Sequence, residues 1–501
     1  MSPAGGGPLR VLHVGSEALP WCKTGGLADV VGALPAALQV AGAGAVQLAT
    51  LLPLYPQVRA AARALGLRLV DTGARPRLRN RRGAKVWTVR RPGPAVFFLE
   101  LRGVFDRPTL YGPDQSAYAA QGYEDNVERF ALLCEAAVEA GDQLMGGPVG
   151  LFHAHDWQAA AIPGLLADRG RATPSLLTVH NLAYTGPFGP TEALGLPLSA
   201  AMVRGPYQHG GRGSLLAGGL ALATAISTVS PSYAAQIQGP AEGGPFAPLL
   251  AARGVVGVAN GLDRAAWDPA RDPHLPQPFS AADLSGKGAA RRAALAHFGV
   301  LDAPDELVLG VVARLVPQKG LDLLLDLLPV LHQVGARLLI LGEGDAGLAA
   351  ALRAGVEGSR RRAGLIVGFD EGLAHRIIAG ADVLLVPSRF EPCGLTQLAA
   401  QATGTVPLVH PTGGLRDTVD DPGDEGLRAG RGSGLWMGAP TGAALVAAVQ
   451  RAVTLQRAEP AVWDALRRRI MGLPLGWEAP AQAYLALYGA LTVAPGPSAL
   501  A

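Results

Sequence analysis

Short apolar runs alternate with helical patterns along most of this 501-residue chain. The runs occupy residues 9–14, 46–52, 96–101, 150–153, 176–179 and 225–229, and then 307–312, 337–341, 364–367, 381–386 and 406–409. Short buried strands between helices are typical of parallel sheets that helices cover on both faces. We therefore predict an α/β protein of two Rossmann-like, doubly wound domains that face a central cleft. Folds of this type bind ligands at the carboxyl ends of their strands.

A polar, proline-rich stretch at residues 267–285 separates two similar halves, as expected for a linker. Each half opens with a strand, a basic loop with glycine, and a leucine-rich helix. We predict an N-terminal domain over 1–264, a linker over 265–285, and a C-terminal domain over 286–478. A helix within 479–501 is expected to return to the N-terminal domain, with the chain frayed from Val493 onward.

The composition argues against several classes of protein. A formal net charge of +3 and 17% charged residues do not make the clustered basic surface of a nucleic-acid binder. Three cysteines far apart form neither a disulfide framework nor a zinc cluster. The most apolar long stretch, residues 215–226, contains two glycines and is short for a membrane span. We expect a cytoplasmic protein with no nucleic-acid or membrane partner, and the oligomeric state stays open.

The first candidate site is the loop Lys23-Thr-Gly-Gly, between an apolar run and a helix. Gly25 and Gly26 allow a ligand close to the backbone, and the free N–H groups that open a helix favour an anion. Lys23 adds a positive charge. This pattern predicts a site for a phosphorylated small molecule, and a tight turn with a solvated lysine is the alternative.

A second basic loop follows the run at 307–312 and carries Arg314 and Lys319. Arginine offers a two-pronged fork to phosphate oxygens and lysine a point charge. Two fixed cations would offset the negative charge that develops on a leaving diphosphate. An ordinary solvated basic loop is the alternative.

Histidines end two of the predicted strands. His153 and His155 would lie on the same side of one strand, directly before Asp156, and His180 and Asn181 follow another. The spacing His-x-His-Asp suggests a metal site, but no further cluster of metal-binding residues at suitable spacing supports one. We predict polar residues that line the cleft, with hydrogen-bonded structural histidines as the alternative.

The segment 388–398 follows a strand and enters a helix. Glu391 is placed to meet hydroxyl groups of a ligand, while Gly394, Leu395 and Thr396 offer backbone N–H groups at the helix start. The alternative for Glu391 is a helix N-terminal charge stabilised by the dipole.

Together these segments resemble the bacterial glycogen synthase and plant starch synthase family. Members are retaining glycosyltransferases of the GT-B fold that use ADP-glucose. The matching pieces stand in family order at residues 16–17, 23–29, 52–55, 153–157, 178–184, 228–233, 260–263, 314 with 319, 388–398 and 412–419.

The resemblance implies a role for each matched residue. Lys23 would lie near the phosphates or the transferred sugar, Arg314 and Lys319 would grip the diphosphate, and Glu391 would bind the donor glucose. His180 would lie beside the reacting sugar. The remaining matched residues would serve the sugar or the glucan acceptor: Glu17, Asp29, Asp156 and Asn181.

The same resemblance implies transfer of glucose to the non-reducing end of an α-1,4-glucan, by positioning and charge stabilisation. Neither a metal nor a cofactor is expected, because Arg314 and Lys319 can replace the cation. Two residues depart from the family pattern: Ala399 stands where an aromatic is common, and Ala217 where a lysine is usual. The alternatives are a related enzyme that uses UDP-glucose or a small acceptor, a catalytically silent binding protein, and a metal-dependent hydrolase at 153–156.

Overall fold

The computed structural model describes residues 7–112 and 122–492, so the expected fraying from Val493 lies outside the described residues. The chain divides into two compact units. Unit 1 comprises Met1–Gly261 and Trp477–Ala501, and unit 2 comprises Leu262–Gly476.

Unit 1 is built on a nine-stranded sheet in the order β12-β11-β7-β6-β1-β2-β5-β4-β3. All neighbours are parallel except the last two pairs, β5 with β4 and β4 with β3. The strands are β1 (Leu9–Val14), β2 (Val46–Pro53), β3 (Leu69–Asp71), β4 (Lys85–Val89), β5 (Ala95–Glu100), β6 (Leu151–His155), β7 (Ser175–Val179), β11 (Ala225–Thr228) and β12 (Val256–Gly257). A small antiparallel sheet adds β8 (Pro187–Phe188), β9 (Gln208–His209) and β10 (Arg212–Ser214).

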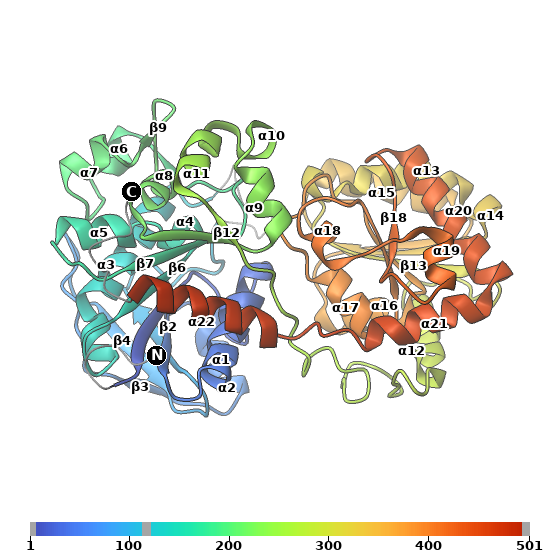
Figure 1. The fold of residues 1–501 in the computed structure, drawn as a ribbon, viewed down its shortest axis with the longest axis horizontal. Coiled ribbons are helices and arrows are strands. Elements are labelled where there is room, and N and C mark those ends of the chain that lie inside the picture. Colours follow the sequence, from blue (N-terminus) through green and yellow to red (C-terminus); the bar gives the residue numbers. More distant parts are fainter. Residues whose placement is uncertain (1–6, 113–121, 493–501) are drawn as a thin grey trace. The chain divides into compact units, whose positions relative to one another are not determined.

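Helices cover both faces of the large sheet (Figure 1). The helices of unit 1 are α1 (Gly26–Ala41), α2 (Pro56–Ala64), α3 (Asn126–Leu144), α4 (Asp156–Ala159), α5 (Ile162–Asp168), α6 (Pro190–Ala193), α7 (Ala200–Arg204), α8 (Leu215–Leu222), α9 (Pro231–Ile237), α10 (Pro240–Gly243), α11 (Ala247–Arg253) and α22 (Glu478–Thr492), with a 3₁₀ turn η1 (Gly244–Phe246). Adjacent residues of β1 face opposite sides: Val11 joins the core under α1 and α22, and Leu12 the core that includes α3. Burial on both faces explains why the sequence shows unbroken apolar runs.

The last helix, α22, packs against α1 in unit 1 (Figure 1). Tyr484 and Tyr488 are fully buried there, in one cluster with Val30 and Leu34 of α1. A helix from the end of the chain therefore completes one face of the first sheet.

Unit 2 has a six-stranded, wholly parallel sheet in the order β15-β14-β13-β16-β17-β18. The strands are β13 (Leu307–Val312), β14 (Ala336–Gly342), β15 (Ala363–Val367), β16 (Val383–Val386), β17 (Val406–Val409) and β18 (Leu435–Trp436). The helices are α12 (Ser285–His297), α13 (Leu324–Leu327), α14 (Leu331–Val334), α15 (Ala346–Gly358), α16 (Glu371–Gly380), α17 (Thr396–Ala402), α18 (Gly414–Thr418), α19 (Gly423–Arg428), α20 (Gly442–Ala458) and α21 (Pro460–Met471), with the 3₁₀ turns η2 (Pro317–Lys319), η3 (Leu321–Leu323) and η4 (Leu328–Val330). Both units are doubly wound α/β structures, which confirms the predicted fold class.

The proline-rich segment that the sequence assigns to a linker is part of unit 2 and packs within it. Trp267 stacks on His375 of α16, with ring centroids 3.9 Å apart. His375 also hydrogen-bonds to the buried Asp272 carboxylate over 2.6 Å. Proline-rich composition therefore marks an irregular segment here, but one with buried anchors.

Candidate active site

The predicted site residues of each unit follow strands at the point where the sheet order reverses. In unit 1, β1 lies between β2 and β6, and in unit 2, β13 lies between β14 and β16. The connections from these neighbouring strands run in opposite directions, which leaves a crevice at the carboxyl ends of the strands. Residues after β1, β6 and β7 in unit 1, and after β13 and β16 in unit 2, are therefore positioned to meet a ligand.

In unit 1, the glycine loop after β1 is held by carboxylates on both sides. Glu17 accepts hydrogen bonds from the Thr24 backbone N–H and from the Thr24 hydroxyl, the latter at 2.9–3.0 Å. The Lys23 ammonium lies 2.9 Å from Asp29, in the first turn of α1. Gly25 is the N-cap of α1 and Gly26 its first residue. The structure thus brings together Glu17, Lys23 and Asp29, three residues selected from the sequence.

The ends of β6 and β7 meet around Asp156. Its carboxylate accepts hydrogen bonds from the backbone N–H groups of His180 at 2.6 Å and Asn181 at 3.3 Å. Asp156 has a φ of +58°, a conformation uncommon for a residue other than glycine. Such strained residues concentrate at functional sites. Asp156 therefore fixes the backbone that carries His180 and Asn181.

Burial shifts the pKa values of these groups in the direction that favours the neutral form of each side chain. It raises the pKa of Glu17 to about 7, against the opposing hydrogen bonds from Thr24. The pKa of Asp156 also rises to about 7 through burial. Burial lowers the pKa of His180 to about 3, so the ring is neutral at pH 7.

Three buried histidines lie together beneath this region. Ring nitrogens of His13, His153 and His155 lie within 4.8 Å of one another, close enough to suggest a metal site. Each of these nitrogens already lies within hydrogen-bond distance of another side chain. A hydrogen-bonded network therefore accounts for the cluster, as the sequence allowed for His153 and His155.

In unit 2, Lys319 and Glu391 form a mostly buried ion pair. Their Nζ and Oε2 atoms are 2.6 Å apart, and the Glu391 side chain is 7% exposed. Ser388 donates a second hydrogen bond to the same carboxylate oxygen over 3.0 Å. Gly320 follows Lys319 with a φ of +63°, and a Cβ there would lie 2.2 Å from the Pro387 carbonyl oxygen. Only glycine lets this loop approach the end of β16 so closely.

The other predicted residues of unit 2 lie around the same strand ends. Arg314 is half-buried in the loop between β13 and η2. Gly394, with a φ of +75°, precedes Leu395, the N-cap of α17, and Thr396 opens that helix. Ala399 is 1% exposed and packs with Leu398 in an apolar cluster. A side chain at position 399 therefore acts on core packing.

Sequence reasoning missed three polar residues that contact the site residues. His13 lies within the apolar run of β1 and was not singled out. A histidine inside an otherwise apolar strand could have indicated a buried polar contact. Ser388 belongs to the segment 388–398 that the sequence singled out, but no role was assigned to it. Tyr488 lies in α22, and nothing in its local sequence distinguishes it from other buried aromatic residues.

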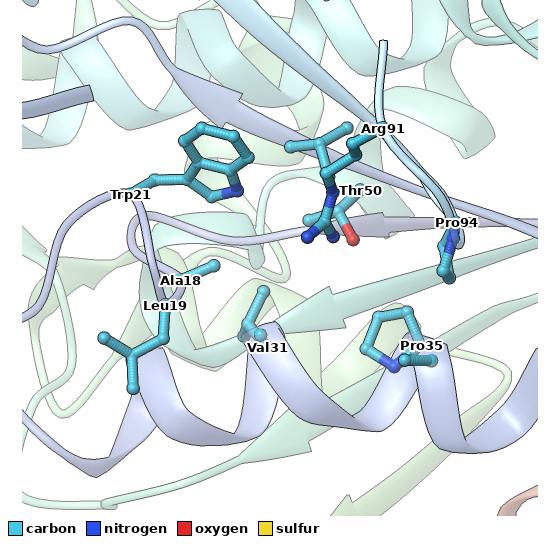
Figure 2. A pocket seen from close by; sticks show the side chains of 11 residues that line it. Ala18, Leu19, Trp21, Val31, Pro35, Thr50, Arg91 and Pro94 are labelled. Carbon is cyan, nitrogen blue, oxygen red and sulfur yellow. The ribbon is translucent and has the colours of Figure 1, made fainter. Parts of the chain in front are cut away.

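A separate small pocket lies between α1 and the neighbouring strands of unit 1 (Figure 2). It is lined among others by Leu19, Trp21, Pro35 and Arg91. None of the predicted site residues lines it. We assign no function to this pocket.

Comparisons with known proteins agree with the two-unit arrangement. Residues 10–252 match the family of starch synthase catalytic domains, and residues 306–454 match the glycosyl transferases group 1 family. Among the described residues, no helix is both long and apolar enough to cross a membrane.

Full-length relatives cover nearly all of the chain. A glycogen synthase of Acidiphilium cryptum is 44% identical over 97% of this chain and 100% of its own length. A glycogen synthase of Methylocella silvestris is 41% identical over 96% and 98%. The catalytic domain of starch synthase IV from Arabidopsis thaliana, solved with ADP and acarbose, has a TM-score of 0.86 at 28% identity and covers 97% and 99% of the two chains. These likenesses confirm the GT-B fold and the resemblance found in the sequence: the chain belongs to the glycogen synthase family of glycosyltransferases.

Proposed function

We propose that this enzyme transfers glucose from ADP-glucose to the 4-hydroxyl at the non-reducing end of an α-1,4-glucan, with retention of the anomeric configuration. The observation that carries the proposal is the Lys319–Glu391 pair beside the sheet reversal of unit 2, with Ser388 on the same carboxylate. It combines a cation for phosphate with an acceptor for sugar hydroxyls, as a nucleotide sugar needs. The glycogen synthase relatives and the ADP-bound starch synthase structure support the choice of donor and acceptor.

In this proposal Lys319 and Arg314 take the diphosphate, whose charge grows as the glycosidic bond breaks. Glu391 accepts hydrogen bonds from donor glucose hydroxyls once the diphosphate draws Lys319 away. Lys23, with the N–H groups of Gly25 and Gly26, supplies further positive charge in unit 1.

Retention is proposed to follow a front-face route. The acceptor hydroxyl attacks from the side on which the diphosphate leaves, and a diphosphate oxygen takes its proton. The protein positions the reactants and stabilises charge, and it supplies no covalent nucleophile. Two cationic side chains on the diphosphate make a metal or cofactor unnecessary in this scheme. Glu17, Asp29, Asp156 and Asn181 are assigned to the sugar or the acceptor.

A donor and acceptor panel tests the proposal. Purified enzyme is given ADP-glucose or UDP-glucose with glycogen or glucose 6-phosphate, and the anomeric linkage is determined by proton NMR. We expect ADP-glucose with glycogen to give the highest kcat/KM and an α-1,4 product. A wide preference for UDP-glucose or for the sugar phosphate would overturn the assignment. Loss of transfer in chelator would contradict the metal-free scheme.

A further inference from the structure

A continuous line of hydrogen bonds joins His180 to the interior of unit 1. His180 Nε2 lies 3.0 Å from His155 Nδ1, and His155 Nε2 lies 3.1 Å from His13 Nδ1. His13 Nε2 lies 3.3 Å from the Tyr488 hydroxyl. We call this line, with its continuation below, the histidine relay.

The relay continues from α22 back into the sheet. The Tyr488 hydroxyl lies 2.6 Å from His153 Nδ1, and His153 Nε2 lies 2.6 Å from the Thr178 hydroxyl. Thr178 in turn lies 2.7 Å from the Ser227 hydroxyl of β11. The relay therefore crosses four adjacent strands, β1, β6, β7 and β11, and is bridged by one side chain from α22.

All members of the relay are buried, and burial keeps its imidazoles neutral. The pKa of His13 falls to about 3, and the pKa values of His153 and His155 lie well below the usual range. Burial likewise holds the pKa of Tyr488 above its usual range, so the phenol keeps its proton. A neutral imidazole has one N–H donor and one bare acceptor nitrogen.

Because each imidazole donates once and accepts once, the direction of one hydrogen bond fixes the next. A hydroxyl of the relay could also accept from both of its neighbours, but its own buried proton would then have no acceptor in the relay. Two states remain in which all links point the same way. In one, every proton points towards His180, and the His180 ring carries its proton on Nδ1. In the other, every proton points towards Ser227, and His180 carries its proton on Nε2.

The Ser227 end distinguishes these two states. Within residues 7–112 and 122–492, Thr178 is the single recorded hydrogen-bond partner of the Ser227 hydroxyl. If Thr178 donated to Ser227, the buried Ser227 proton would have no acceptor, and an unsatisfied buried donor costs about 1–3 kcal/mol. If Ser227 donates to Thr178, each link of the relay is made and the proton left over is the one on His180 Nδ1. Among the described residues, this nitrogen does not belong to the fully buried side-chain atoms that lack a partner, so water or a ligand can accept its proton. The state directed towards His180 is therefore favoured.

We propose that Tyr488, His13 and His155 are positioning residues that hold His180 as the Nδ1–H tautomer. In the described part of the chain, no protein group is recorded as a hydrogen-bond partner of His180 Nδ1, so this nitrogen is available to a ligand. An N–H at this position donates to an oxygen acceptor, such as a sugar hydroxyl. The role of His180 beside the sugar rests on the proposed function, whereas its Nδ1–H tautomer is inferred independently of that function.

NMR of the ligand-free enzyme labelled with ¹⁵N-histidine tests the tautomer directly, because protonated and bare ring nitrogens differ widely in ¹⁵N chemical shift. The His180→Gln variant assigns the resonances by their disappearance. We expect the His180 proton on Nδ1 in the parent enzyme. A proton on Nε2 would overturn the proposal, whatever donor the enzyme uses.

The variant Tyr488→Phe removes the bridging hydroxyl and keeps the ring packed in α22. His13 then loses its donor, so we expect a substantial shift of His180 towards the Nε2–H tautomer. Hydrogen-bond partners that orient metal-binding histidines are typically worth about 10–100-fold in metal affinity or activity. By analogy, we expect kcat to fall about tenfold here, with little change in the KM for the donor. An unchanged His180 tautomer in a folded Tyr488→Phe enzyme would overturn the coupling.

The matched control is Tyr484→Phe, one helical turn earlier. The Tyr484 ring packs 5.4 Å from that of His153, yet its hydroxyl is not a link of the relay. We expect the parent tautomer and a kcat within about twofold, and a shift as large as that of Tyr488→Phe would attribute the effect to packing. Should Tyr488→Phe fail to fold, Thr178→Val breaks the relay at the far end. It is expected to shift the same His180 resonances, and their constancy would overturn the coupling.

Discussion

The two basic loops occupy equivalent places in their sheets, but their lysines are held in different ways. Lys23 of unit 1 pairs with Asp29, six residues along the chain, and both side chains are about a quarter exposed. Lys319 of unit 2 pairs with Glu391, 72 residues away, and the pair is far more enclosed. The first loop therefore stabilises its own cation, while the second depends on contact between two strand ends.

This difference has an energetic consequence. A partly exposed ion pair contributes about 0–1 kcal/mol, because water and salt screen it. Removing one member of an enclosed pair leaves a charge with little solvation and costs several times more. We therefore expect substitutions in unit 2 to affect both activity and stability, and those around Lys23 to affect mainly ligand use.

The largest effect is expected for Glu391→Ala. The variant loses the acceptor proposed for sugar hydroxyls, and we expect kcat/KM to fall at least about 100-fold, the size of loss seen when a single group that stabilises a transition state is removed. Glu391→Gln, which keeps the shape and loses the charge, should be intermediate. Initial rates with ADP-glucose, beside thermal unfolding curves, measure this. Near-parent rates in a folded Glu391→Ala enzyme would remove Glu391 from the site.

Lys319→Ala and Lys23→Ala compare the two ion pairs directly. We expect Lys319→Ala to lower the free energy of unfolding by about 3 kcal/mol, because Glu391 loses its counter-ion in an enclosed place. Lys23→Ala should cost less than about 1 kcal/mol. Urea unfolding of the two variants gives both values. Equal losses of unfolding free energy would show that the two ion pairs contribute equally to stability.

The pH dependence of stability tests the loop of unit 1. The raised pKa of Glu17, about 7 against 4.5, means that the folded state holds a proton that the unfolded state releases. Stability should therefore fall as the pH rises from about 4.5 to about 7, by at most about 1.4 kcal/mol per pH unit from this group. Glu17→Gln should reduce this slope, and Asp156 accounts for part of the remainder. Urea midpoints at pH 5 and pH 8 measure the change, and an unaltered slope would contradict the assignment to Glu17.

Asp29→Asn is expected to have the smallest effect. It releases Lys23 without removing its charge, so the free energy of unfolding should change by less than about 1 kcal/mol. The KM for the donor should change by a few-fold at low salt, and the change should shrink in 0.5 M salt as screening grows. A salt-independent change would indicate that the contact assigned to Asp29 with the sugar or the acceptor outweighs its pairing with Lys23.

Sequence patterns predicted the buried central strands well, but they missed strands at one side of the large sheet and the interruption of a helix in unit 2. The runs at β1 and β13 have the bounds expected from apolar residues, because these strands are buried on both faces. The edge strand β3 and its neighbour β4 were missed, since partly exposed strands of three and five residues carry a weak signal. The leucine-rich helix expected after Gly320 is instead divided into short segments around Pro329, because proline interrupts a helix.

The sequence by itself determined the order of strand, glycine loop and helix, the fold class and the family, because these depend on neighbouring residues and on motifs in sequence order. Only the tertiary structure decided which side chains touch. The pairing of Lys319 with Glu391 and the contact of Tyr488 with His13, 475 residues apart, depend on strand order and helix packing. Such contacts form between elements that hydrophobic burial brings together, and local sequence carries no record of the partner.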